Sequence, residues 1–186
     1  MALLLPALAR ANDGPEAVSA EWRSHSYVLT YSGFTSIYSC DGLEWKLKLL
    51  LKTAGARDDL SVRATCSGPT SGPSRFVTAR LQFATLALPD SPPVPGEAPD
   101  AKRPAPVPAV GLWREVKFAQ RSPRNLEGGD CELVEQFDRE LLKYFTVRNR
   151  QEHMACIPHQ SNLNGIALSF AVLAAPPKHK EPAKAK

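Results

Sequence analysis

The chain has 186 residues, which suits one domain or two small ones, and its hydrophobic content of 43% is enough for a packed core and excludes a wholly disordered chain. No run of about 18 apolar residues occurs, so no membrane-crossing helix is predicted. The net charge of +4 is mostly local: the segment after Pro177 holds four lysines and one glutamate, so the rest of the chain is close to neutral and nucleic-acid binding is disfavoured.

The first eleven residues resemble the end of an export signal. Met1 to Leu8 is an apolar run, and Ala9-Arg10-Ala11 has small residues at the spacing of a cleavage site. Because a basic leading region is missing, we expect the natural start to lie upstream and cleavage to follow Ala11; a frayed apolar N-terminus is the alternative. Residues 12–24 are predicted to form a flexible lead, because residues 12–21 are polar and small and include Gly14 and Pro15.

Residues 25–89 are predicted to form a first β-α-β-β unit. Alternating aromatic and aliphatic residues predict a strand over 25–32. Leucines at helical spacing predict a helix, for which Asp41 and Glu44 form a variant of the capping box and Gly55 supplies a left-handed stop. Two further strands are predicted over about 60–66 and 75–86.

Residues 90–110 are predicted to be a linker, because eight of the 17 prolines lie between positions 89 and 108 and proline cannot donate to a strand ladder. A ligand for an aromatic groove on a partner is the alternative. Residues 111–176 are predicted to form the second β-α-β-β unit, and the lysine-, proline- and alanine-rich tail over 177–186 to be disordered. The elements of this unit are a strand over 112–118, a helix over about 131–144 with Asp130 as its N-cap, and strands over about 145–156 and 166–174.

The two units are predicted to be copies of one ancestral unit. Residues 81–89 and 168–176 are identical at six of nine positions, and in each unit a helical period precedes an alternating strand. Two copies are too few for a solenoid. We therefore expect one α+β domain of two pseudo-repeated units, with a mostly antiparallel sheet and two helices on one side. Whether the strands form one sheet or two is left open, and chance similarity of two unrelated units is the alternative.

Four cysteines fit an oxidising compartment. Of the three possible pairings, the duplication favours Cys40–Cys66 and Cys131–Cys156, because each unit then closes its own loop. Each bridge would tie the start of a helix to the end of the strand that follows. A zinc site would normally contain close cysteine pairs, which this sequence lacks; free thiols in a cytosolic protein are the other alternative.

No catalytic, cofactor-binding or metal-binding residue is predicted. His153, Met154 and Cys156 lie close together, but strand alternation places His153 on the opposite face from the other two. His159 follows a proline and His25 is distant in sequence, so the histidines lack ligand spacing and are predicted to be surface or turn residues.

The acidic residues of the second helix are predicted to form a solvated face. Glu132, Glu135 and Asp138 have helical spacing, and Glu135 with Arg139 is an i,i+4 pair. The Gly128-Gly129 turn before this helix offers amide donors to an anion, but a bare glycine turn is weak evidence. Nine arginines near the strands are predicted to form ordinary surface pairs with neighbouring acids, a patch for an acidic glycan or a phosphate-bearing surface being the alternative. They are Arg57, Arg63, Arg75, Arg80, Arg114, Arg121, Arg124, Arg148 and Arg150.

The segment Gly128-Gly129-Asp130-Cys131-Glu132-Leu133-Val134-Glu135-Gln136-Phe137, together with Cys40-Asp41-Gly42-Leu43-Glu44, resembles a family of uncharacterised small secreted proteins of Gram-negative bacteria. The resemblance covers residues 25–176 and implies export, but it implies no activity and no catalytic residues.

These observations predict an exported, periplasmic or secreted, disulfide-stabilised domain that binds a protein or envelope component and is not an enzyme. An enzyme or small-ligand carrier with a site between the two units is the alternative. A pocket with convergent polar groups, including His153 or His159, would favour the carrier or enzyme.

Overall fold

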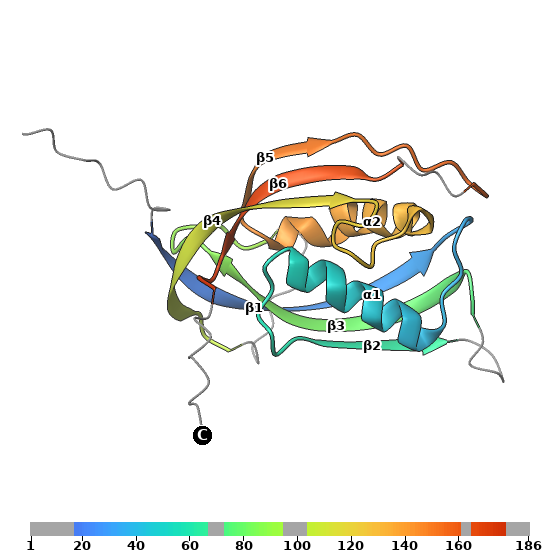
Figure 1. Ribbon diagram of the computed structural model, residues 1–186. Coiled ribbons are helices and arrows are strands. Elements are labelled where there is room, and N and C mark those ends of the chain that lie inside the picture. Colours follow the sequence, from blue (N-terminus) through green and yellow to red (C-terminus); the bar gives the residue numbers. More distant parts are fainter. Residues whose placement is uncertain (1–16, 67–72, 95–103, 161–164, 178–186) are drawn as a thin grey trace, which may run out of the picture.

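The computed structural model describes residues 17–66, 73–94, 104–160 and 165–177 and shows a six-stranded antiparallel sheet with two helices, an α+β fold (Figure 1). The predicted fold class is confirmed at this level, and the strands form one sheet. The residual signal-like segment and nearly all of the tail lie outside the described residues, as does much of the linker. The strands are β1 (Ala17–Ser32), β2 (Ser61–Cys66), β3 (Phe76–Ala87), β4 (Val107–Ala119), β5 (Val147–Glu152) and β6 (Ala167–Ala174), and the helices are α1 (Cys40–Thr53) and α2 (Cys131–Gln136).

The sheet is built from two halves with the same internal order. Its strand order is β2-β3-β1-β4-β6-β5, so in each half the last strand lies between the other two. In the part of the chain that the structure describes, the only strand pairing between the two halves of the sheet is that of β1 with β4, over the six residue pairs from Ala17–Leu112 to Trp22–Val107. Beyond these pairs, β1 pairs only with β3 and β4 only with β6, and the two halves lie on either side of the helices in Figure 1. This shared order is what a duplication predicts, and overlaying the two halves would test it.

One continuous core joins both helices to the sheet. The α1 residues Leu43, Leu47, Leu50 and Leu51 are completely buried, because their spacing places them on one helix face. They belong to the same buried cluster as apolar residues of the α2 region and of all strands but β5, which contributes only the half-buried Val147. Burying each side chain of this size stabilises the fold by roughly 1.5–3 kcal/mol.

Helix α1 ends as predicted but begins differently. Gly55 has a φ of 100°, the left-handed conformation that stops the helix. The N-cap is Ser39, whose hydroxyl accepts a hydrogen bond from the Gly42 amide at 3.1 Å, and not the predicted pair of Asp41 and Glu44. Glu44 instead accepts a bond from the Ala64 amide at 2.9 Å, so it ties the helix to β2.

The second helix occupies the predicted range but is irregular. After α2 the chain makes a π-helical turn, Phe137–Leu141, and a tight 3-10 turn, Leu142–Tyr144. Asp130 precedes α2, but its side chain does not cap this helix. It accepts a hydrogen bond from the Glu127 amide at 2.7 Å, within the 3-10 turn Gly128–Asp130.

Both strands at the junction begin earlier than predicted. Residues 17–24 of the expected flexible lead belong to β1, and residues 107–110 of the expected linker belong to β4, because the two segments pair with each other. Pro108 is tolerated there, since this end of β4 has a partner strand on one side only. Strand β5 is shorter than predicted and ends at Glu152. The predicted alternation nevertheless continues beyond it, because His153 is exposed whereas Met154 and Cys156 are half-buried and pack against the core.

Candidate functional site

The four cysteines form two disulfides, Cys40–Cys66 with a Cα–Cα distance of 5.8 Å and Cys131–Cys156 with one of 5.5 Å. Each bridge starts at the first residue of a helix, and Cys66 is the last residue of β2. The pairing is the one predicted. Within the described ranges no group of three or more His, Cys, Asp or Glu residues could hold a metal ion.

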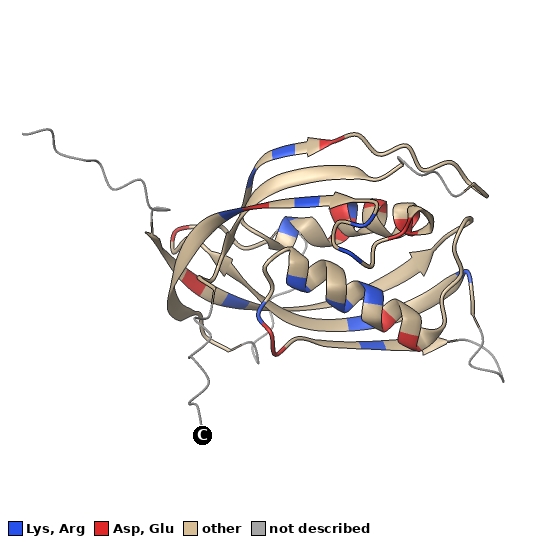
Figure 2. Cartoon of the chain, viewed as in Figure 1, with Lys and Arg blue, Asp and Glu red and all other residues tan. Residues whose placement is uncertain are grey.

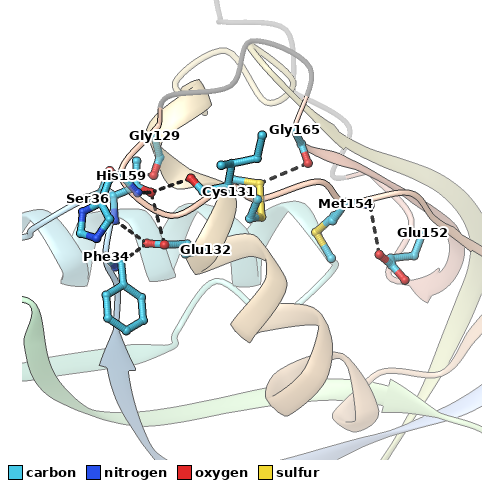
Figure 3. Close-up of a disulfide and its surroundings, with 12 residues drawn as sticks. Phe34, Ser36, Gly129, Cys131, Glu132, Glu152, Met154, His159 and Gly165 are labelled. Atoms are coloured by element: carbon cyan, nitrogen blue, oxygen red, sulfur yellow. Dashed lines mark hydrogen bonds between the residues drawn. A yellow bond between two sulfur atoms is a disulfide. The ribbon is translucent and has the colours of Figure 1, made fainter.

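A seam of buried and partly buried polar contacts joins the two halves beside the second disulfide (Figure 3). The Glu132 carboxylate accepts hydrogen bonds from the amides of Phe34 and Thr35 at 2.8 and 2.9 Å, and from the Thr35 hydroxyl at 3.2 Å. Gln136 accepts a bond from the Ser32 amide and donates one to the Ser32 carbonyl at 2.5 Å. The second half therefore fixes the loop between β1 and α1.

Asp130 is the most heavily bonded member of this seam. Its buried carboxylate accepts hydrogen bonds from the Tyr38 hydroxyl at 2.6 Å, the Lys46 ammonium at 2.5 Å and the Glu127 amide at 2.7 Å. Burial, with the negative charge of Asp130 beside it, holds the pKa of Tyr38 above its ordinary value. Asp130 is thus a structural ion that ties α1 to the α2 region.

The prediction of a solvated acidic face on the second helix is wrong for two of its three residues. Glu132 is buried, and the side chain of Asp138 is only 8% exposed and bonds Arg150 at 2.5 Å; Glu135 alone is exposed. Arg139 bonds Glu140 at 3.2 Å. The physical reason is that this helix face packs against the backbone amides of Phe34 and Thr35 and against the Arg150 guanidinium. Carboxylates form strong charge-assisted hydrogen bonds with such donors.

A cavity of about 640 Å³ opens between the two halves, and we call it the interhalf cleft. Its floor is the face of β1 and β3 that carries Arg23, His25 and Thr85. The loop after β3, residues 91–94, forms one wall, and residues 138–147 form the other. A cavity of this volume is within the usual range for small-ligand sites.

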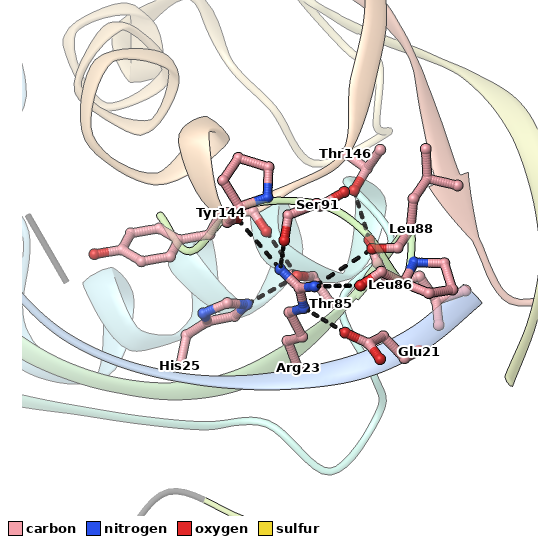
Figure 4. Close-up of polar contacts among 11 residues, drawn as sticks. Glu21, Arg23, His25, Thr85, Leu86, Leu88, Ser91, Tyr144 and Thr146 are labelled. Atoms are coloured by element: carbon pink, nitrogen blue, oxygen red, sulfur yellow. Dashed lines mark hydrogen bonds and ion pairs between the residues drawn. The ribbon is translucent and has the colours of Figure 1, made fainter. Parts of the chain in front are cut away.

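The polar floor of the cleft is a fixed hydrogen-bonded chain (Figure 4). The Thr85 hydroxyl donates to the Tyr144 carbonyl at 2.6 Å, so toward His25, whose Nε2 lies 3.0 Å away, it can only accept. His25 therefore carries a proton on Nε2. It is only 5% exposed and packs against the rings of Phe83 and Tyr144, at centroid distances of 5.3 and 5.0 Å.

The prediction that His25 is a surface or turn residue is therefore wrong. The alternation in this strand could have predicted its burial, since His25 lies on the same face as the buried Leu29 and Tyr31. His153 and His159 are exposed as predicted. His159 contacts the Phe34 ring at the far end of the seam (Figure 3).

Arg23 lies on the floor of the cleft, where its contacts are structural. Its guanidinium pairs with Glu21 at 2.7 Å and donates to the carbonyls of Leu88, Pro89, Ser91 and Pro92 at 2.8–3.4 Å. Five contacts match the five donors of an arginine. Figure 4 shows the side chain surrounded by this loop, so Arg23 clamps the loop after β3 onto β1.

The predicted arginines divide into paired and unpaired groups. Arg57 and Arg150 bind the carboxylates of Asp59 and Asp138, as expected for surface pairs. Arg63 and Arg80 face each other across β2 and β3, both exposed, and no ion pair reaches them in the described ranges. Basic and acidic residues are interspersed over both helices and the strands (Figure 2), so these two do not extend into a wide basic face.

Tyr27 lies on β1 next to the cleft, and its raised pKa predicts how stability changes at alkaline pH. Burial, and then its hydrogen bond to Glu140 at 3.0 Å, raises the pKa of Tyr27 from 10.0 to about 12. Because the folded state prefers the protonated phenol, this contribution to stability is complete below pH 10 and is lost as the pH rises toward about 12. Near-ultraviolet titration should show a tyrosinate step near pH 12 in the native protein that is missing in Tyr27→Phe. If Tyr27→Phe instead lacks a tyrosinate step that the native protein shows near pH 10, the raised pKa of Tyr27 is contradicted.

Comparison of the chain with protein-family models, with curated proteins and with solved structures found no match. In the described part of the chain, no helix combines the length and apolar character needed to cross a membrane.

Proposed function

We propose that this protein is an exported, disulfide-stabilised binding domain that is not an enzyme and takes its ligand in the interhalf cleft. The observation that supports the proposal most is the cleft itself, a cavity of about 640 Å³ with walls from both halves. The ligand would therefore bind between the two halves and not on an outer surface. This is the location that the sequence analysis gave for its alternative, a small-ligand carrier.

The state of the polar groups favours binding over catalysis. A nucleophilic hydroxyl must give its proton to a base. The Thr85 proton is held instead by the Tyr144 carbonyl, and His25 is a donor toward Thr85, not a base. The Arg23 donors are occupied by the loop carbonyls. The cleft therefore offers shape and a rigid floor, which suit selective binding.

Export and duplication are part of the same proposal. Two disulfides with both partners buried or half-buried support an oxidising compartment such as the periplasm or the outside of the cell. The signal-like residues 1–11 and the resemblance to secreted Gram-negative proteins point the same way. The identical strand order of the halves supports descent from one duplicated β-α-β-β unit.

A neutral fluorescent probe, N-phenylnaphthylamine, tests the cleft as a binding site. We expect one molecule to bind per chain, with backbone amide shifts in NMR spectra gathered around Thr85, Val94 and Leu142. Val94→Trp should weaken binding by filling the cleft. Val28→Trp is the matched control, because Val28 is 52% exposed and points to the opposite face of β1. Binding that shifts other residues, or no binding by the native protein, would refute the cleft as the site.

A further inference from the structure

Lys143 is the one cation of the interhalf cleft that lacks a carboxylate partner in the described ranges. Four cations line the cleft, and three of them are paired: Arg23 with Glu21 at 2.7 Å, Arg139 with Glu140 at 3.2 Å and Arg150 with Asp138 at 2.5 Å. No ion pair or hydrogen bond in the described ranges reaches the Lys143 ammonium. A positive charge is therefore available at the wall of the cleft.

Two aromatic rings hold this ammonium in place. The Lys143 Nζ lies 5.5 Å from the centre of the Tyr27 ring and 5.4 Å from that of Tyr144. Cation–π contacts of this kind are worth about 0.5–1 kcal/mol at exposed sites, enough to favour one side-chain position without neutralising the charge. Tyr144 itself packs on His25, so the ammonium is linked to the rigid floor.

The rest of the cleft offers mostly apolar surface. Its walls include Pro92, Pro93 and Val94 from the loop after β3, and Leu142, Phe145 and Val147 from the opposite side. Polar floor groups are already bonded to one another, as described for Thr85. A ligand therefore meets an apolar slot with one unpaired positive charge at its side.

We infer that the ligand of the interhalf cleft is a small, largely apolar molecule with a single anionic group, which binds beside the Lys143 ammonium. This inference rests on the proposed function and adds the chemical class of the ligand. The anion pairs with the Lys143 ammonium, which has no carboxylate partner among the described residues, and the apolar body displaces water from the proline, valine, leucine and phenylalanine walls.

Chain-matched probes test the inference by displacement of N-phenylnaphthylamine. Octanoate should bind more tightly than octanol, and octylammonium should bind least, because all three have the same apolar chain and differ only in the head group. Inorganic phosphate, which has charge but no apolar body, should displace the probe poorly. Lys143→Met should weaken octanoate binding about tenfold or more and leave octanol binding unchanged, as expected for loss of one charge-assisted contact.

Two further variants separate charge from packing. Lys143→Arg should retain the preference for octanoate, and Arg80→Met, which removes an exposed cation outside the cleft, should change nothing. The inference is overturned if octanoate fails to bind, if octanol or octylammonium binds as tightly, or if Lys143→Met leaves octanoate binding intact. If the neutral probe still binds in the cleft in such a case, the proposed binding site stands and only the ligand class is wrong.

Discussion

Replacing Asp130 by alanine should lower the free energy of unfolding by about 3–5 kcal/mol, the range for removing one partner of a buried ion pair. The Lys46 side chain is only 12% exposed, and without Asp130 its charge keeps one neutral acceptor, the Asn125 carbonyl at 2.8 Å. The Tyr38 hydroxyl and the Glu127 amide lose their acceptor at the same time. Buried donors without acceptors retain their full desolvation cost, so the losses at Lys46 and Tyr38 account for most of the effect, and the partly buried Glu127 amide adds to them.

Urea denaturation of native protein, Asp130→Ala and Glu135→Ala measures this effect. Glu135→Ala is the matched control, because it removes a carboxylate from the same helical region at an exposed position and should change stability by no more than about 0.5 kcal/mol. The double variant Asp130→Ala/Lys46→Met should recover part of the loss, since it removes the uncompensated charge. A loss below about 1 kcal/mol for Asp130→Ala would show that the seam does not depend on this residue.

Removing the second disulfide as Cys131→Ala/Cys156→Ala should cost about 3 kcal/mol, as the chain-entropy model gives for a loop of this length. The two cysteines are 25 residues apart in sequence. Because Cys131 is buried, its replacement by alanine also removes packing contacts around the start of α2. The matched variant Cys40→Ala/Cys66→Ala, with a separation of 26, should cost a similar amount. Denaturation curves under non-reducing conditions would give both values.

Peptide mapping under the same non-reducing conditions checks the assumption beneath these variants. Proteolytic fragments should link residue 40 to 66 and residue 131 to 156. A fragment that links residue 40 to 131, or 66 to 156, would contradict the pairing and the account of each half as a separately closed unit. If the two double cysteine variants have the same free energy of unfolding as the native protein, the disulfides do not contribute to its stability.

Local patterns in the sequence were sufficient for the elements, their order and the disulfides. The leucine spacing of α1, the alternation in β3 and the left-handed Gly55 act within a few residues, so the chain carries their signal directly. The cysteine pairing followed from the similar sequence separation of the two cysteines in each half, 26 and 25 residues, which can be read directly from the sequence. Errors at the ends of β1 and β4 arose because those residues become strand only by pairing with each other.

The roles of the polar residues were decided by the tertiary structure alone. The sequence presents Glu132 as one acid on a helix, but its partners are backbone amides 97 and 98 residues away, supplied by the opposite half. His25 and Lys143 gain their places in the cleft in the same way, from rings and walls that distant segments bring together. Periodicity tells which face of an element is apolar, whereas the value of a charge depends on what is packed against it. Only the folded arrangement of the two halves determines that environment, and with it the cleft that we propose as the binding site.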